Sequence, residues 1–210
     1  MAKRWYRERK KDFYYRQAKK QGYRARSAFK LLQIQKRYNI IKKGDTVLDL
    51  GAAPGGWSQV AKEIVGEKGK IIGVDLLPIK PIKNVFFIEG DITDTKTIEK
   101  IKKIIGKKKV DAIISDMSPN ISGNYTLDQA RSVWLCEHAL KYAEKFLKEK
   151  GNLVCKVFEG EDFNKLREKI KKRFYTVENV IPKASRKTSS EVYLVALSFK
   201  PKTNKNNSQP

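Results

Sequence analysis

The chain has 210 residues, a length that suits one α/β domain with a sizeable core and a short appendage but not two full domains. Its 46 lysines and arginines outnumber 23 aspartates and glutamates, so the net charge is +23 and the pI is near 9.9. Such an excess is hard to explain for an enzyme of small neutral metabolites and indicates a polyanionic partner. A lysine-rich solvated surface of the thermophilic kind would be balanced in charge, and here the ratio is two to one.

The positive charge is concentrated at the N-terminal end of the chain. Residues 1–43 contain 16 lysines and arginines and only Glu8 and Asp12 as acids, a net charge of +14 that leaves +9 for the other 167 residues. We therefore expect residues 1–43 to form a basic helical extension that binds RNA, ahead of a catalytic domain at 44–200.

Cysteine usage and hydropathy exclude several other classes. Cys136 and Cys155 lie in apolar runs and form no C-x-x-C pair, so we expect neither a disulfide nor a bound metal. No apolar stretch approaches the roughly 18 residues of a membrane span, and the first ten residues contain no apolar signal segment. The sequence predicts a soluble, cytoplasmic protein without membrane contact.

Residues 3–26 interleave basic side chains with aromatic rings, which can grip phosphates while the rings stack on bases. Packing of these rings against the domain explains the pattern equally well, and both interpretations stay open. The following residues, Ser27–Tyr38, have helical spacing with Ser27 as the expected N-cap. The aromatic residues of the first segment are Trp5, Tyr6, Phe13, Tyr14, Tyr15 and Tyr23.

From Asp45 onward, short apolar runs alternate with amphipathic stretches, a pattern that predicts alternating strands and helices. The expected strands are 46–50, 70–74, 85–89, 110–115, 152–157, 175–181 and 191–199. The expected helices are 57–65, 95–105, a long one within 127–148, and 163–172. Residues 201–210 are polar, and we expect a disordered tail there.

This alternation indicates an α/β fold with a mostly parallel sheet and helices on both faces. Only the loop 182–190 separates the last two strands, so they should form an antiparallel hairpin at the end of the sheet. A mostly parallel sheet with an antiparallel C-terminal strand resembles the seven-stranded Rossmann-like sheet of methyltransferases.

A glycine-rich loop, VLDLGAAPGGWSQV, joins the first strand to the next helix. Gly51, Gly55 and Gly56 permit a tight turn and a close backbone approach to a ligand. Ala53 stands where the dinucleotide motif G-x-G-x-x-G requires glycine, and Pro54 stiffens the turn. The loop also lacks the G-K-[ST] ending of a P-loop, which disfavours a nucleoside triphosphate.

Acidic residues end the next two strands. Asp75 closes IIGVD and can accept hydrogen bonds from the hydroxyls of a ribose, and Asp91 followed by Ile92 closes the third strand in EGDI. A single acid at a strand end is usually a turn former. Together with the glycine loop, however, these positions predict a ligand site at the carboxyl edge of the sheet.

Lys156 interrupts the apolar strand NLVCKVF, and burying a lysine costs several kcal/mol unless it is paired. Asp116, at the end of the neighbouring strand, is the expected partner. A structural ion pair is one interpretation. The other makes Lys156 a general base that deprotonates a weak hydroxyl nucleophile, with Asp116 orienting the amine and Lys30 nearby. Glu191 would then position Lys156 or bind the substrate.

The strings SAFKLLQI, DLGAAPGGWSQV, GVDLLPI, EGDITD, SDMSPNISG, CKVFEG and RKTSSEVYLVA resemble the FtsJ/RrmJ family of RNA 2′-O-ribose methyltransferases, from about residue 4 to residue 199. The resemblance implies S-adenosylmethionine as cofactor and an RNA ribose as target. It places the family's catalytic tetrad on Lys30, Asp116, Lys156 and Glu191. It implies cofactor contacts at Gly55, Trp57, Asp75, Asp91 and Asp116, beside the loop residues Gly51, Ala53, Pro54, Gly56 and Ile92. The RNA-binding candidates are Arg24, Arg26, Lys30, Arg186 and Lys187.

Among family branches, the chain resembles most the one that methylates a uridine in the A-loop of large-subunit rRNA, either as free RNA or in a ribosomal particle. A tRNA anticodon-loop 2′-O-methyltransferase is an alternative within the family. A non-catalytic RNA-binding assembly factor is an alternative outside catalysis. We expect a monomer, and we interpret His138 and Cys155 as structural.

Overall fold

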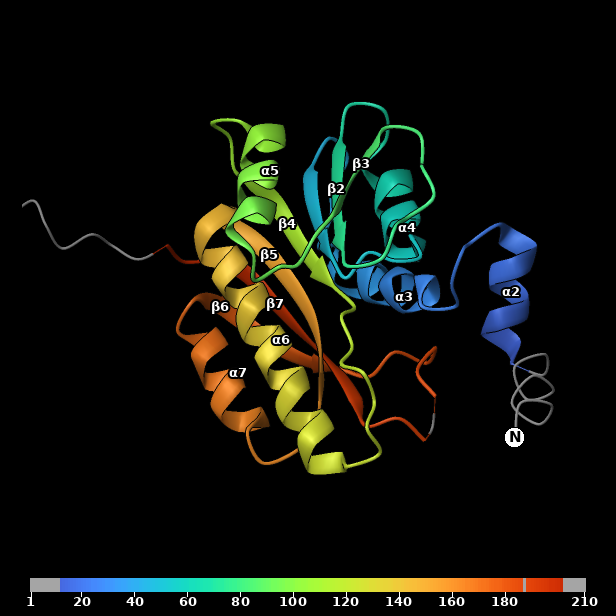
Figure 1. Ribbon diagram of the computed structural model, residues 1–210, viewed down its shortest axis with the longest axis vertical. Coiled ribbons are helices and arrows are strands. Elements are labelled where there is room, and N and C mark those ends of the chain that lie inside the picture. The colour runs from blue at the N-terminus through green and yellow to red at the C-terminus, as the bar shows by residue number, and fades with distance from the viewer. Residues whose placement is uncertain (1–11, 187, 202–210) are drawn as a thin grey trace, which may run out of the picture.

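The computed structural model describes residues 12–186 and 188–201, and its centre is a seven-stranded sheet in the order β3-β2-β1-β4-β5-β7-β6 (Figure 1). The strands are β1 Thr46–Leu50, β2 Lys70–Asp75, β3 Val85–Glu89, β4 Val110–Ser115, β5 Leu147–Phe158, β6 Phe174–Val180 and β7 Glu191–Phe199. The helices are α2 Phe13–Gln21, α3 Ala28–Tyr38, α4 Gly56–Val65, α5 Thr95–Ile105, α6 Tyr125–Phe146 and α7 Phe163–Lys171. The expected seven strands and mostly parallel sheet are confirmed.

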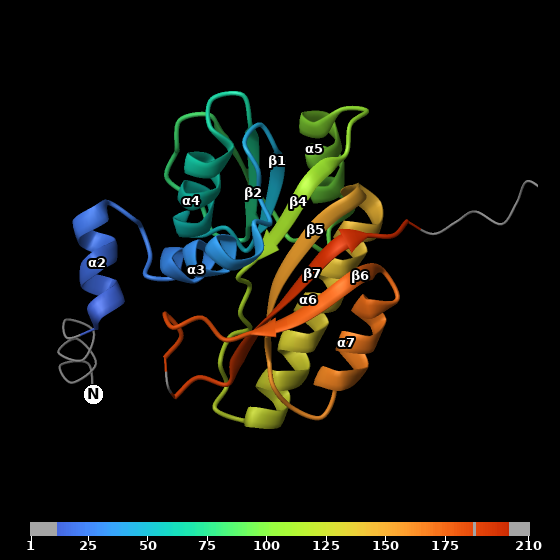
Figure 2. The same ribbon diagram turned by 180° about the vertical axis from the view of Figure 1, so that it is seen from behind.

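The helices form a layer on each side of the sheet (Figure 2). One apolar cluster contains buried residues of α5, α6 and α7 together with strand residues such as Leu48 and Ile113. The other contains residues of α3 and α4 together with Val47 and Ile114. Because neighbouring strand residues point to opposite faces, β1 and β4 contribute to both cores.

The hairpin at the end of the sheet has the predicted antiparallel pairing, but its second strand does not lie at the edge. β7 inserts between β5 and β6 and is antiparallel to both. Burial explains the order: β7 is almost wholly buried, whereas β6 exposes most of its residues. A strand buried on both faces belongs inside a sheet.

Three local predictions need correction. Ser27 precedes α3 as expected, but its backbone is already helical (φ −62°, ψ −19°) and its side chain makes no cap. The sequence predicts bounds only for Ser27–Tyr38 within the helical extension expected over residues 1–43, and α2 is a second helix within it. Strand β5 begins at Leu147 instead of Asn152. Its residues 148–150 are exposed, and the register between β4 and β5 shifts in this section. Their polar side chains conceal a strand from sequence patterns.

The aromatic rings of the described N-terminal segment mainly pack against each other. Tyr14 contacts Phe29 at a centroid distance of 5.5 Å, and Tyr23 contacts Phe29 at 5.8 Å. The Tyr23 hydroxyl donates to Glu63, and burial followed by this contact raises the pKa of Tyr23 to about 12. Phe13 alone of these rings is largely exposed, so packing accounts for Tyr14 and Tyr23.

Some predictions fall outside the described residues: those for Trp5, Tyr6 and Lys187, and that of a disordered tail over 202–210. The boundary at residues 43 and 44 remains a prediction, although α3 contributes to the same apolar cluster as α4. Within residues 12–186 and 188–201, no helix combines the length and apolar character needed to cross a membrane.

Replacing Ile34 tests whether α3 is an integral part of the domain. Ile34 is fully buried between α3 and the sheet. We expect Ile34→Ala to lower the free energy of unfolding by about 2–5 kcal/mol, measured by urea denaturation, because the substitution leaves a cavity. The exposed Lys36 of the same helix provides the control. An effect of Ile34→Ala no larger than that of Lys36→Ala would show that α3 is only loosely attached.

Candidate active site

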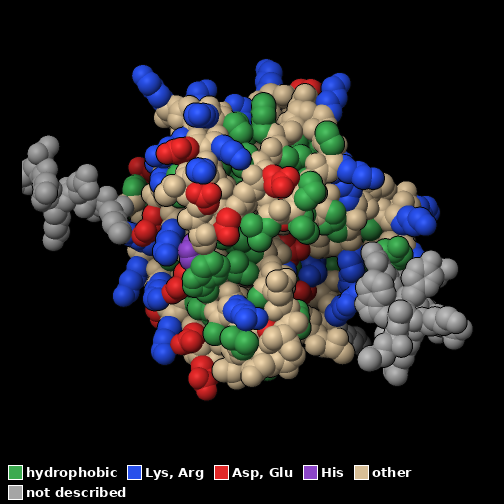
Figure 3. All heavy atoms as spheres, in the orientation of Figure 1, with side chains coloured by type: hydrophobic (Ala, Val, Ile, Leu, Met, Phe, Trp, Pro, Cys, Tyr) green, Lys and Arg blue, Asp and Glu red, His purple; other side chains and the backbone are tan. Residues whose placement is uncertain are grey.

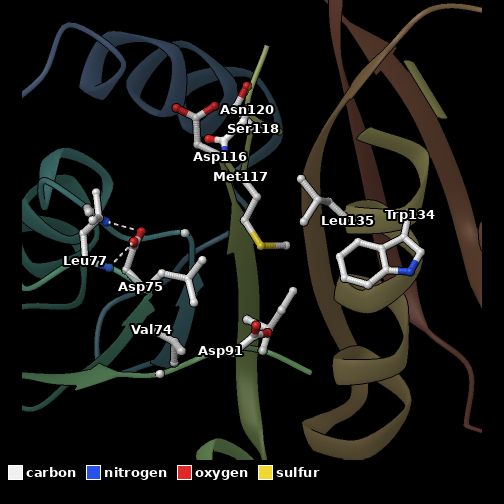
Figure 4. A pocket seen from close by; sticks show the side chains of 15 residues that line it. Val74, Asp75, Leu77, Asp91, Asp116, Met117, Ser118, Asn120, Trp134 and Leu135 are labelled. Carbon is white, nitrogen blue, oxygen red and sulfur yellow. Dashed lines mark hydrogen bonds between the residues drawn. The ribbon is translucent and has the colours of Figure 1, made fainter. Parts of the chain in front are cut away.

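The carboxyl ends of β1, β2, β3 and β4 meet at a pocket of about 530 Å³ that also reaches α6 (Figure 4). This volume is in the range of pockets that hold cofactors. In Figure 4, Asp75 lies on one side of the pocket, Trp134 and Leu135 of α6 on the other, and Met117 between them. The lining residues are Gly51, Ala53, Val74, Asp75, Leu76, Leu77, Gly90, Asp91, Ile92, Asp116, Met117, Ser118, Asn120, Trp134 and Leu135.

Gly51 and Ala53 of the glycine loop line the pocket. Gly51 has a positive φ of 75°, and a Cβ at this position would lie 2.5 Å from the Cγ atom of Met117. The Gly51 and Ala52 N–H groups donate to the Val74 carbonyl at 2.9 and 3.1 Å, which ties the loop to the end of β2. Only glycine combines this backbone conformation with this close contact.

Asp75 organises the backbone around the pocket. Its Oδ2 accepts the Ala53 N–H at 2.8 Å, and its Oδ1 accepts the Leu77 N–H at 2.9 Å. Asp91 accepts two hydrogen bonds from Thr93, from the N–H and the hydroxyl, and these lower the pKa of Asp91. Both acids therefore stand as oriented carboxylates on the wall of the pocket.

Of the predicted cofactor residues, six line the pocket: Gly51, Ala53, Asp75, Asp91, Ile92 and Asp116. The other four, Pro54, Gly55, Gly56 and Trp57, are not among the lining residues. Gly55 faces the Arg24 side chain, and Gly56 faces Ala25. The Trp57 indole is buried, donates to the Ser27 carbonyl at 2.9 Å and packs in the core with α3. Any cofactor contact of Trp57 would therefore come from its backbone.

Asp116 and Lys156 form the expected ion pair. Lys156 Nζ lies 3.0 Å from Asp116 Oδ1 and donates to the Asp116 backbone carbonyl at 2.8 Å. Tyr193 donates its hydroxyl to Asp116 Oδ1 at 2.7 Å. Burial raises the pKa of Asp116, but Lys156, Lys30 and the Tyr193 hydroxyl outweigh it, so the pKa lies below its usual value. Asp116 is thus an ionised carboxylate that holds the lysine amine beside the pocket.

Lys30 and Glu191 form a second buried ion pair, with 2.5 Å between Lys30 Nζ and Glu191 Oε1. Lys30 Nζ also lies 5.6 Å from the centre of the Tyr193 ring. The partner of Glu191 in this pair is Lys30 and not Lys156, so positioning of Lys156 by Glu191 would be indirect. The four tetrad residues are nevertheless brought together from α3, β7, β5 and the end of β4.

The predicted RNA-binding arginines have partners within the chain. Arg24 donates to the carbonyls of Pro54, Lys80 and Pro81, so it fastens the glycine loop to the loop after β2. Arg26 pairs with Asp12 and donates to a carbonyl of the β6–β7 loop, and Arg186 approaches the same carboxylate.

Tyr193 is the main residue that the sequence analysis missed. It is fully buried, and its ring stacks on Trp57 at a centroid distance of 5.7 Å. Burial, followed by the charges of Asp116 and Glu191, raises the pKa of Tyr193 well above its usual value. In an apolar strand a tyrosine looks like ordinary core. A usable signal existed, because residues i and i+2 of a strand share a face and Tyr193 follows Glu191 by two.

The model of the family described as FtsJ-like methyltransferase matches residues 23–199. This chain belongs to that family. It is 52% identical over 198 residues to ribosomal RNA large subunit methyltransferase E of Methanocaldococcus jannaschii, covering 92% of this chain and 81% of the relative. It is 49% identical over 207 residues to the protein of the same name from Methanobrevibacter smithii, covering 98% of each.

Solved structures agree with this assignment. A ribosomal RNA methyltransferase from Plasmodium falciparum has a TM-score of 0.77 and 34% identity, and the match covers 84% of this chain and 98% of that one. Aeropyrum pernix fibrillarin, solved in complex with S-adenosylmethionine, has a TM-score of 0.58 at 19% identity, covering 83% and 75% of the two chains. The second similarity is one of fold.

The cofactor of this methyltransferase is S-adenosylmethionine, and the pocket suits it. The carboxylates of Asp75, Asp91 and Asp116 can accept hydrogen bonds from hydroxyl and amino groups, and Asp116 favours a nearby positive charge such as a sulfonium. Within the described parts of the chain, no cluster of three or more His, Cys, Asp or Glu residues is placed to hold a metal ion.

Asp49 lies fully buried beneath the glycine loop. Its Oδ2 accepts the Ser58 hydroxyl at 2.7 Å, while its Oδ1 has no hydrogen-bond partner among the described residues. Burial raises the pKa of Asp49 to about 7; the Ser58 hydrogen bond opposes the shift, and the charges of Asp116 and Asp75 add to it. The folded protein therefore binds a proton here that the unfolded chain, with an ordinary carboxyl, releases near pH 4.

This proton makes stability depend on pH. The contribution of Asp49 is fully present below the unfolded pKa and is lost as pH rises towards the folded value of about 7. We expect wild type to lose on the order of 3–4 kcal/mol relative to Asp49→Asn between about pH 4 and pH 7.5, measured by urea denaturation. Parallel stability curves for the two proteins would contradict the elevated pKa.

Proposed function

We propose that the protein transfers the methyl group of S-adenosylmethionine to the 2′-hydroxyl of a uridine in the A-loop of large-subunit rRNA, with Lys156 as general base. The observation that carries the proposal is the buried Lys156–Asp116 pair, whose carboxylate also lines the cofactor pocket. The names of the archaeal relatives support rRNA as the substrate. The net charge of +23 favours a polyanionic partner.

The reaction needs a base close to the methyl donor. When bound, S-adenosylmethionine supplies an electrophilic methyl group on a sulfonium. Lys156, after releasing its own proton to solvent, would accept the proton of the ribose hydroxyl as the oxygen–methyl bond forms and the sulfur–methyl bond breaks. Asp116 holds the amine through its carboxylate and its carbonyl, and Tyr193 holds the carboxylate. The amine is therefore fixed before substrate arrives, which lowers the entropic cost of alignment.

Lys30 and Glu191 suit the placement of the target ribose. Their ion pair lies beside the Tyr193 ring and joins α3 to the start of β7. Charged groups held in fixed positions can donate to and accept from ribose hydroxyls without reorganising. On the face in Figure 3, Lys and Arg side chains lie mainly around the periphery, with hydrophobic and acidic side chains towards the middle. The many basic side chains on this face can attract a polyanion such as RNA.

A tRNA anticodon-loop 2′-O-methyltransferase remains the alternative within the family, because the catalytic residues contact a ribose and a methyl donor and not a distant RNA shape. A non-catalytic RNA-binding assembly factor is the alternative outside it. That alternative would tolerate the loss of Lys156.

Lys156→Ala separates catalysis from binding. We expect methyl transfer to fall at least about 100-fold, because the base is gone, while affinity for RNA changes little. Radiolabelled methyl incorporation measures the first and fluorescence anisotropy the second. Because Asp116 would be left buried without its lysine, the variant should also be less stable, by about 3–5 kcal/mol, so assays belong well below its unfolding temperature.

The exposed Lys165, which pairs with Asp162 on the surface, provides the matched lysine control. Lys165→Ala should retain full turnover. Near-normal turnover of folded Lys156→Ala would refute the role of Lys156 as base.

The RNA target is testable by mapping. We expect labelled methyl groups in large-subunit rRNA, at a 2′-oxygen, when purified protein is offered naked rRNA, ribosomal particles and tRNA in parallel, followed by nuclease mapping. The catalytic set predicts alkali-resistant linkages at the modified nucleotide, since the 2′-oxygen is blocked. Transfer to tRNA alone would replace the rRNA assignment with the tRNA alternative.

A further inference from the structure

Asp12 joins three segments that are distant in sequence. Its carboxylate accepts the Tyr15 N–H at 3.1 Å and so caps α2, and it forms an ion pair with Arg26. Arg186, from the β6–β7 loop, places its Nε 4.0 Å from Asp12 Oδ2. Arg26 also donates to the Ala184 carbonyl of that loop at 2.6 Å. α2, the segment before α3 and the β6–β7 loop therefore meet at one carboxylate.

The charges at this point do not balance, because two guanidinium groups share one carboxylate. Burial lowers the pKa of Arg26 and the charge of Arg186 lowers it further, while Glu191 opposes the shift. Glu191, however, is already paired with Lys30 at 2.5 Å. The two arginines thus retain an excess of positive charge, which an additional or stronger anion would stabilise.

The exposure of the three side chains differs in a useful way. Arg26 is 19% exposed and Asp12 15%, so this pair is largely fixed in place. Arg186 is 55% exposed and faces solvent. An anion from solution can therefore contact the Arg186 guanidinium directly. It can contact the Arg26 guanidinium as well if it displaces the Asp12 carboxylate.

A phosphodiester is the anion that this arrangement fits. Guanidinium groups present planar donor pairs that match carboxylate and phosphate oxygens alike, and each phosphodiester carries the same single negative charge as Asp12. Arg26 lies two residues before α3 and Lys30 lies in its first turn, so the site is close to the Lys30–Glu191 pair, where the target ribose is proposed to bind.

We propose that Arg26 and Arg186 bind a backbone phosphate of the RNA substrate next to the target nucleotide, and that Asp12 occupies this phosphate site in the free protein. The inference rests on the proposed function in taking RNA as the substrate. Asp12 then acts as an internal competitor: it keeps the two arginines together in the absence of RNA and reduces their affinity for polyanions that are not held by the rest of the site.

Asp12→Asn tests the competition, because asparagine caps a helix as well as aspartate does but carries no charge. The probe is a fluorescein-labelled oligouridylate of about 20 nucleotides, titrated by anisotropy with the full-length protein over about 50 to 300 mM KCl. We expect the variant to bind about 3- to 10-fold more tightly at low salt, as removal of one ion pair predicts. Its salt dependence should be steeper by about one released ion.

Two further variants control the measurement. Asp162→Asn removes the same charge from the residue before α7, where no side-chain cap is made and the carboxylate pairs only with the exposed Lys165. This variant reports the effect of losing one surface carboxylate and its ion pair away from Arg26 and Arg186. Arg186→Gln should bind several-fold more weakly, with a salt slope smaller by about one. Its side chain is exposed, so folding is not at risk, and it decides the question if circular dichroism shows that Asp12→Asn loses α2.

Two results would overturn the phosphate site: Asp12→Asn binding no more tightly than Asp162→Asn, or Arg186→Gln keeping the wild-type affinity and salt slope. Failure of the proposed function has a different signature. It would appear as an absence of methyl transfer from wild type to any RNA, whereas the oligouridylate titrations need no turnover. The two inferences can therefore fail separately.

Discussion

The active site depends on holding one lysine amine against one aspartate carboxylate inside the domain. Neither Lys156 nor Asp116 is more than slightly exposed, and removing both charges from water costs several kcal/mol per ion. Their mutual attraction offsets this cost only with well-placed additional contacts. The Asp116 carbonyl and the Tyr193 hydroxyl supply them, at 2.8 and 2.7 Å. These contacts come from β4, β5 and β7, so the pair can exist only where these strands lie side by side.

The position of β7 inside the sheet brings Tyr193 next to Lys156. In the observed register Tyr193 lies directly opposite Lys156, and Glu191 lies opposite Phe158 at the mouth of the site. With β7 at the outer edge, Tyr193 would be a strand farther from Lys156, and Asp116 would lose its hydroxyl donor. The almost continuous burial of β7 and the predominant exposure of β6 both favour the inserted order. The same burial that stabilises the sheet thus places the tyrosine.

Sequence patterns predicted the elements and the lysine–aspartate pair because both follow from local rules: periodicity for the strands, and the cost of an unpaired buried charge for Lys156. They could not predict contacts that depend on the packing of distant segments. The Lys30–Glu191 pair and the Arg24 contacts to the carbonyls of Lys80 and Pro81 belong to this class. Trp57 shows the limit most clearly, since its motif position identifies the loop but not the direction of its indole, which points into the core.

The N-terminal helices connect the stability of the core to the electrostatics of the site. In α3, Leu31 and Ile34 are fully buried against the sheet, and the helix rotation that buries them also directs Lys30 towards Glu191. The Lys30 side chain is already ordered by its ion pair in the free protein. The conformational entropy of this side chain is therefore lost on folding and not on RNA binding. Hydrophobic packing of α3 therefore fixes Lys30 at the proposed ribose site. Arg186, at the proposed phosphate site, is exposed and can be reached by the incoming polyanion.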